Sequence, residues 1–118
     1  MSMSVKAKHD RGCLVVSLCG ELDLKTAGEL KATVDPALLE ARTAPTVVLD
    51  LSGVNFMDSS GMGAILGRYR TVSQMGGKLA VCSLTPQLRK LFELTGLTRI
   101  IPVFASQDDA VVGLQGGE

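Results

Sequence analysis

The chain has 118 residues, enough for one domain, and its 12 basic and 12 acidic side chains give a formal net charge of zero. With 46% hydrophobic and 20% charged residues, its composition is typical of a globular domain with one core. No apolar run approaches the ~20 residues of a membrane-spanning helix, and the first ten residues lack the apolar segment of a secretory signal. Three Phe, one Tyr, no Trp and the lack of a basic run argue against direct nucleic-acid binding.

The three cysteines, Cys13, Cys19 and Cys82, lack the close pairing typical of zinc sites. Because nothing in the sequence indicates export, we expect a cytoplasmic protein with reduced thiols, which behave as small buried apolar groups. The chain has a single histidine, His9, so neither a metal site nor another cofactor is expected.

The N-terminal part alternates between strand and helix patterns. The apolar run over residues 5–22 predicts a long strand and a shorter partner strand, joined by a turn at residues 10–12. The sequence Thr26-Ala27-Gly28-Glu29 fits a capping box at the start of a helix. Pro36 is expected to kink or divide that helix, or to lie in the first turn of a helix restarted after Asp35.

The central part predicts a buried strand followed by an amphipathic helix. The strand covers residues 46–51 and ends at Ser52-Gly53, before an irregular stretch over residues 54–60. Apolar residues at helical spacing then mark the buried face of the helix: Met62, Ile65, Leu66, Tyr69 and Val72. Gly76-Gly77 ends this helix, and residues 78–82 predict another short strand.

The C-terminal part predicts two further helices. Thr85 caps the first of these, and Gly96 ends it in a left-handed conformation. Residues 100–104 predict a last strand, which Pro102 confines to an edge, and Ser106 caps a final helix. Strands alternate with helices throughout, so the sequence predicts an α/β fold with parallel pairs in a mixed sheet of four to five strands and about four helices.

Residues 56–63, between the buried strand and the amphipathic helix, form an unusual polar cluster. Two hydroxyls, Ser59 and Ser60, follow the carboxylate of Asp58 where the helix is expected to begin. The simplest interpretation is an N-cap, in which one of these side chains accepts from the free amides of the first turn. Capping accounts for one or two of the residues but not for the whole cluster.

Two other interpretations lack essential residues. A serine hydrolase needs a base beside its nucleophile, but His9 is far away in the sequence and the segment is not Gly-x-Ser-x-Gly. A dinucleotide-binding loop needs Gly-x-Gly-x-x-Gly directly after the strand, whereas Gly61, Gly63 and Gly67 are spaced one residue too widely. We expect these glycines to allow close packing on a neighbouring element instead.

A phosphorylation switch fits the cluster better. A phosphate on a serine at a helix N-terminus adds about −1.5 to −2 charges, which the free amides and the helix dipole can stabilise. Next to Asp58, the same charge would repel an acidic partner or collide with a tightly packed one. Such a site would change binding while leaving the stability of the fold nearly unchanged.

Four separated segments resemble the STAS domain of bacterial anti-sigma factor antagonists: residues 54–70, residues 20–23, Gly76-Gly77 and residues 91–97. The first contains Met57-Asp58-Ser59-Ser60-Gly61-Met62-Gly63, and its helix from Gly63 to Arg70 is closest to the sporulation type, the antagonist of the forespore anti-sigma factor. The resemblance implies a single STAS-type domain over residues 1–118.

The resemblance also implies a mechanism. In this family the unphosphorylated antagonist binds an anti-sigma factor that is also a serine kinase, and thereby frees the sigma factor. The kinase then phosphorylates the serine after the motif aspartate, here Ser59, which releases the antagonist, and a PP2C-type phosphatase restores it. By the same match, the expected partner-binding residues are Glu21, Asp23, Asp58, Ser60, Gly61 and Met62.

The resemblance predicts an interaction switch that is not an enzyme, and a monomer is the default expectation. Two alternatives stay open. One is a small anion- or nucleotide-binding α/β domain that uses the helix start at residues 59–61. The other is a STAS scaffold within a larger regulatory complex, in which Ser59 is never modified.

Overall fold

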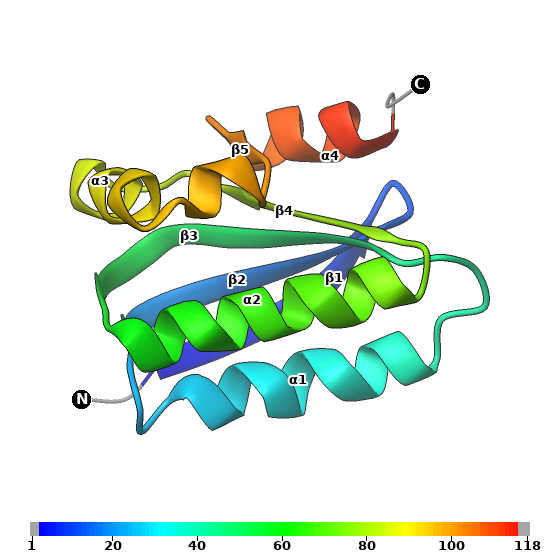
Figure 1. Cartoon of the computed structure of the whole chain (residues 1–118). Coiled ribbons are helices and arrows are strands. Elements are labelled where there is room, and N and C mark those ends of the chain that lie inside the picture. The colour runs from blue at the N-terminus through cyan, green and yellow to red at the C-terminus, as the bar shows by residue number, and fades with distance from the viewer. Residues whose placement is uncertain (1–2, 116–118) are drawn as a thin grey trace.

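The computed structural model describes residues 3–115, which form four α-helices around one five-stranded sheet (Figure 1). The elements are β1 (Met3–Asp10), β2 (Cys13–Leu22), α1 (Ala27–Leu39), β3 (Thr46–Met57), α2 (Ser59–Gln74), β4 (Lys78–Cys82), α3 (Pro86–Thr95), β5 (Val103–Phe104) and α4 (Gln107–Gln115). This confirms the expected fold class and element order. A short 3₁₀ helix, η1 (Leu97–Arg99), was not expected.

The strands lie in the order β1-β2-β3-β4-β5, in which β1 is antiparallel to β2 and every other pair is parallel. Arg11 and Gly12 join β1 to β2, with φ values of 52° and 86°. Positive φ at both central residues is what a two-residue hairpin turn needs if it is to match the twist of the strands. The predicted hairpin is therefore confirmed.

Each face of the sheet has its own apolar core. The larger core lies under α1, α2 and α3 and includes Leu18, Leu49 and Phe92. The smaller core lies under α4 and is built from small side chains of the sheet: Cys13, Val15, Val48, Ala80 and Cys82. Cys13 and Cys82 are buried as expected, whereas Cys19 is exposed because α4 does not reach that part of the sheet face.

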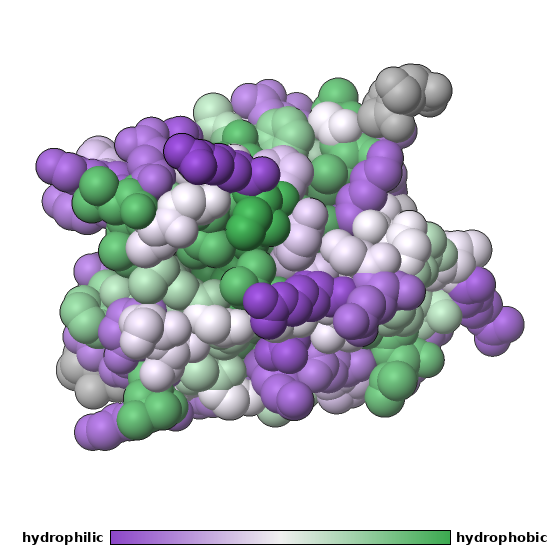
Figure 2. Space-filling model, viewed as in Figure 1, coloured by the Kyte–Doolittle hydropathy of each residue, from purple (hydrophilic) through white to green (hydrophobic). Residues whose placement is uncertain are grey.

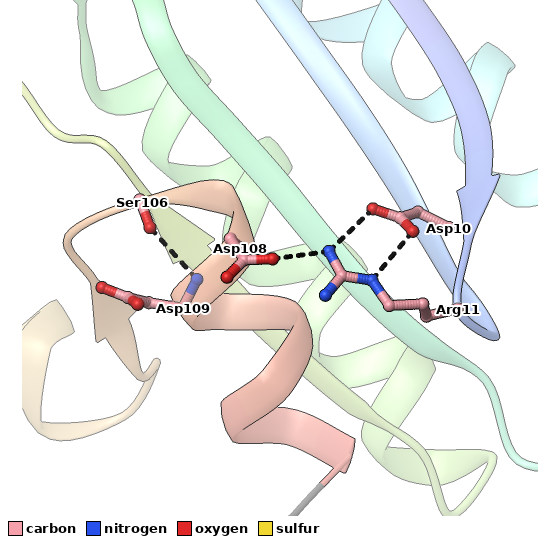
Figure 3. Close-up of polar contacts among 5 residues, drawn as sticks. All are labelled: Asp10, Arg11, Ser106, Asp108 and Asp109. Carbon is pink, nitrogen blue, oxygen red and sulfur yellow. Dashed lines mark hydrogen bonds and ion pairs between the residues drawn. The ribbon is translucent and has the colours of Figure 1, made fainter.

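Polar contacts hold the start of α4 against the sheet (Figure 3). The guanidinium of Arg11 contacts Asp10 at 3.0 Å and Asp108 at 2.8 Å, which links the β1–β2 turn to the first turn of α4. The hydroxyl of Ser106 accepts from the backbone N–H of Asp109 at 3.1 Å, so the predicted cap of this helix is confirmed.

β3 extends to Met57, six residues beyond the predicted end of the strand. The expected irregular stretch is therefore wrong over residues 54–57. Two register shifts against β2 keep β3 paired past Ser52-Gly53. A Cβ atom on Gly53 would lie 2.9 Å from the carbonyl oxygen of Leu18, so glycine allows this close approach between the strands.

α1 is one continuous helix with Pro36 inside it, so the expected division, or restart after Asp35, is wrong. The proline removes one backbone hydrogen bond. Packing of the buried face on both sides of Pro36 compensates for this loss, because Leu30, Val34 and Leu38 all enter the core. Asp35 does not start a new helix. Its carboxylate oxygen lies 2.9 Å from Nε of Arg68 in α2.

The C-terminal elements follow the predictions except in the length of β5. The hydroxyl of Thr85 accepts from the N–H of Leu88 at 3.2 Å, and Gly96 has a left-handed φ of 81°. β5 pairs with β4 at the sheet edge as expected, but it contains only residues 103–104, directly after Pro102. The proline has no N–H to donate, and the N–H groups of Ile100 and Ile101 donate to the carbonyl oxygen of Leu97 at η1 instead of to a neighbouring strand.

Candidate functional site

The candidate site lies at the carboxyl ends of β2 and β3. The two strands are parallel, and Leu22 pairs with Met57 as the last residue of each. The backbone N–H of Asp58 donates to the carbonyl oxygen of Leu22 at 3.3 Å. The loop after β2 and the start of α2 are therefore neighbours, as the family resemblance implies.

Asp58 caps α2. Its carboxylate accepts from the N–H of Gly61 at 3.0 Å, and its carbonyl accepts from Met62 at 3.0 Å. The amides of Ser59 and Ser60 precede the first intrahelical bond and remain available to an acceptor. The first turn of α2 carries no acidic residue. The positive end of the helix dipole is thus balanced locally by the single carboxylate of the cap.

The two hydroxyls of the cluster differ in exposure. Ser59 is the first residue of α2 and is exposed, whereas Ser60 is half-buried. Among residues 3–115, the Ser59 hydroxyl has no hydrogen-bond partner, and the cap is made by Asp58 alone. The simple capping interpretation therefore accounts for Asp58 and leaves Ser59 accessible.

Gly61 brings α2 against the end of β2. The residue is buried, and a Cβ atom there would overlap the carbonyl oxygen of Leu22 and lie 2.9 Å from the side chains of Leu22 and Met57. A Cβ atom added to Gly63 or Gly67 would have no atom of a neighbouring element within 4 Å. The expectation of close packing at the helix glycines is thus correct for Gly61 and wrong for the other two, which face away from neighbours.

The loop between β2 and α1 is ordered by Thr26 rather than by the predicted capping box. The buried Thr26 hydroxyl donates to the carbonyl of Glu21 at 2.6 Å and accepts from the N–H of Asp23 at 2.9 Å. It makes no cap bond to α1, so the capping box with Glu29 is wrong. The hydroxyl satisfies the loop backbone instead, which holds Glu21 and Asp23 in place.

Asp23 is held as a carboxylate by the same loop. Burial opposes its ionisation, but the hydrogen bonds from the backbone N–H groups of Thr26 and Lys25, together with the dipole of the nearby Thr26 hydroxyl, outweigh burial. The pKa of Asp23 therefore lies below its ordinary value. With Glu21 on β2 and Asp58 at the cap, Asp23 gives this edge of the sheet an acidic character.

The structure thus brings the predicted site residues together, but their side chains differ in solvent exposure. Glu21 and Asp23 are half-buried, and Glu21 belongs to β2 itself rather than to the following loop. Met62 is partly buried against the main core. The sequence did not single out Leu24, which is 77% exposed, or the exposed side chain of Phe56. An apolar side chain at the end of a strand has no periodicity that would reveal its exposure.

The opposite end of the sheet holds a cavity of about 280 Å³, between the β1–β2 turn and the loop after α1. His9 lines this cavity and is therefore remote from Ser59. Within residues 3–115, no group of three or more His, Cys, Asp or Glu side chains is placed to hold a metal ion. No helix in the same range is long and apolar enough to cross a membrane.

Comparison with known proteins identifies the family. The family model described as the STAS domain matches residues 4–110. The chain belongs to the STAS domain family. A curated relative, the anti-sigma F factor antagonist of Paenibacillus polymyxa, is 38% identical over 115 residues, which are 98% of this chain and 97% of that protein. The expected family is thereby confirmed.

Solved STAS structures share the fold. An anti-sigma factor antagonist from Mycobacterium paratuberculosis superposes with a TM-score of 0.85 at 28% identity, over 96% of this chain and 94% of that chain. The Bacillus cell fate determinant SpoIIAA in its phosphorylated form superposes with a TM-score of 0.71 at 28% identity, over 92% of this chain and 96% of that chain. The relatives are thus named as regulatory proteins and not as enzymes.

Proposed function

We propose that the chain is a phosphorylation-switched anti-sigma factor antagonist and not an enzyme. The observation that carries the proposal is the exposed Ser59 hydroxyl, unpartnered within residues 3–115, at the start of a helix that Asp58 caps independently. The names of the curated relatives support an anti-sigma factor as the partner. We place the protein in the cytoplasm and take residues 1–118 as one domain.

The switch acts at the acidic edge formed by Glu21, Asp23 and Asp58. The partner is a serine kinase, which binds the unphosphorylated protein and gives up its sigma factor. The γ-phosphoryl group of ATP then moves to the Ser59 oxygen: a new O–P bond forms, the bond to the β-phosphate oxygen breaks, ADP leaves, and the hydroxyl proton passes to a base on the kinase.

Phosphorylation changes binding more than stability. The new phosphate lies at a helix N-terminus, where the free amides of Ser59 and Ser60 favour negative charge. While the kinase is bound, the phosphate on Ser59 faces negative charge, because a kinase site holds the nucleotide phosphates opposite the acceptor hydroxyl. The result is release of an intact domain, and a PP2C-type phosphatase returns the domain to its binding state.

The test is the intact mass of the protein after incubation with ATP and the anti-sigma kinase encoded nearest to it. We expect one added phosphate on the wild type, one on the Ser60→Ala variant and none on the Ser59→Ala variant. Ser60→Ala is the matched control because it removes the neighbouring hydroxyl of the same helix turn. Phosphate on Ser59→Ala, or its absence from a wild type that binds the kinase, would refute the switch at Ser59.

A further inference from the structure

An apolar patch lies between α2 and the chain that follows β4. In Figure 2, hydrophobic side chains gather over this part of the surface. Partly buried side chains on the main core form most of it, and Ile100, 47% exposed, lies after η1. We call the following six residues the α2–α3 patch: Met62, Leu66, Tyr69, Leu84, Leu91 and Ile100.

The α2 side of the patch points away from α1. The buried face of α2 includes Ile65 and Arg68, and Arg68 leans toward α1, where it contacts Asp35. Leu66 and Tyr69 follow these two residues by one position each, which is about 100° around the helix. The side chains of Leu66 and Tyr69 therefore lie on the side of α2 that faces away from α1, and α1 does not cover them.

The patch is continuous with the candidate site. Met62 belongs to the patch and lies one helical turn after Ser59. β4 runs parallel to β3, so α3 begins at the same edge of the sheet as α2. A partner that reaches Ser59 along α2 would meet the patch next.

The acidic edge alone is too small and too polar to hold a stable partner. Specific complexes bury about 800 Å² on each side, contributed by about 20–30 residues. Exposed charges at a rim steer and orient a partner, whereas desolvated apolar anchors supply most of the affinity. Beside Ser59, the exposed side chains of Leu24 and Phe56 can supply part of this anchoring, and the α2–α3 patch supplies the larger group of apolar side chains.

Charge at the patch differs from charge at the edge. Exposed arginines border the patch, Arg70 beyond Tyr69 on α2 and Arg99 directly before Ile100. The edge around Ser59 carries Asp23 and Asp58 instead. A complementary partner therefore has an apolar segment flanked by acidic side chains that lie opposite Arg70 and Arg99.

We propose that the α2–α3 patch is the apolar anchor for the anti-sigma kinase. This inference rests on the proposed function, because it takes the kinase that modifies Ser59 as the occupant. An apolar segment of the kinase with acidic flanks covers Ile100 and Leu66, and thereby holds α2 while the nucleotide site of the kinase faces Ser59.

The test compares Ile100→Glu with the matched control Val112→Glu. Val112 is a β-branched side chain, 55% exposed on α4, on the other face of the sheet. Titration calorimetry without ATP measures the Kd for the kinase. We expect Ile100→Glu to weaken binding at least about tenfold, and Val112→Glu and Ile100→Leu to bind as the wild type does. Thermal melting of each variant alone checks that it folds.

Phosphorylation kinetics provide a second readout. Because Ile100 does not touch the acceptor, Ile100→Glu should raise KM while kcat at saturating antagonist stays near the wild-type value. A milder variant, Ile100→Ala, should shift KM in the same direction by less. A fall in kcat without a change in KM would contradict an anchoring role.

The outcomes separate the two proposals. A wild type that does not bind the kinase would refute the proposed function, and the patch proposal with it. A wild type that binds and is phosphorylated, with an Ile100→Glu variant equal to it, would refute the patch proposal alone. Wild-type dimers in sedimentation that Ile100→Glu abolishes, with kinase binding unchanged, would assign the patch to a second copy of the chain and overturn the proposal.

Discussion

The carbonyl oxygen of Leu22 occupies the place that a Cβ atom on Gly61 would need. The end of β2 and the first turn of α2 are therefore in backbone contact, with no side chain between them. The same carbonyl accepts from the N–H of Asp58 at 3.3 Å. One backbone group thus fixes the position of the helix start that presents Ser59.

Gly61→Ala should destabilise the fold. The new methyl group must displace backbone rather than a flexible side chain, and overpacking of this kind costs about 1–3 kcal/mol of unfolding free energy. Gly63→Ala and Gly67→Ala are matched controls on the same helix, because both sites are open. They should gain up to about 1 kcal/mol from helix propensity. Urea unfolding measures all three, and a Gly61→Ala variant as stable as the controls would contradict the contact.

Asp58→Ala should remove the cap of α2. The amide of Gly61 loses its acceptor, which costs about 1 kcal/mol of unfolding free energy. Asp58→Asn keeps an oxygen that can accept the same bond and should retain most of the stability. The comparison by urea unfolding separates the cap hydrogen bond from the charge of Asp58. Equal losses in the two variants would show that the charge matters more than the bond.

Ser59→Asp should bind the anti-sigma kinase poorly while it stays folded. The added carboxylate lies at the positive end of the α2 dipole, so we expect thermal stability equal to or slightly above that of the wild type. Ser59→Ala should keep wild-type affinity because it adds neither charge nor bulk. Titration calorimetry measures the Kd of both variants for the kinase, and thermal melting measures their stability. An aspartate variant that binds as tightly as the wild type would exclude charge as the cause of release.

Breaking the Asp35–Arg68 pair should be costly. Arg68 is 7% exposed, and its contact with Asp35 links α1 to α2. Asp35→Leu leaves the buried guanidinium without its counter-charge, at a cost of about 1–3 kcal/mol of unfolding free energy, less than for a fully buried pair because the Asp35 side chain is 28% exposed. The double variant Asp35→Leu with Arg68→Leu should recover most of this loss, because it leaves no unpaired charge. A double variant with additive losses would show that the pair is not coupled.

Stability should fall at alkaline pH through the buried thiols. Burial raises the pKa of Cys82 to about 11, and it also raises the pKa of Cys13. An unfolded thiol has a pKa of about 8.5, so between these values the folded state holds more protons and loses stability as the pH rises. Cys82→Ala should flatten this decline relative to the wild type, and Cys19→Ala, at an exposed site, should not. Melting temperatures from pH 7 to pH 10 measure the difference.

Much of the fold follows from local patterns in the sequence. The caps at Thr85 and Ser106 and the turn at Arg11-Gly12 form as predicted, because each uses bonds or torsions within a few residues. The grouping of residues 21–23 with Asp58 is implied by the family resemblance alone, and the structure accounts for it, since β2 and β3 are parallel and end at the same edge of the sheet.

The errors arise where distant contacts override local preference. Pro36 does not divide α1, because the helix is held by its packing on the core. Ser52-Gly53 does not end β3, because register shifts let β2 pair beyond it. Thr26 bonds the carbonyl of Glu21, five residues earlier, rather than the start of its own helix. The exposure of Ile100 depends on η1, for which the sequence carries no clear signal.

The division of the core between two faces sets an order for folding during synthesis. The main core needs α1, α2 and α3, which precede residue 96. The smaller core closes only with α4, which comes after every other described element. Because the ribosome releases the chain from its N-terminus, Cys13, Val15 and Val48 stay uncovered until α4 has emerged. A nascent chain paused before residue 106 would therefore present a bare apolar sheet face to chaperones, even though the residues around Ser59 had already been made.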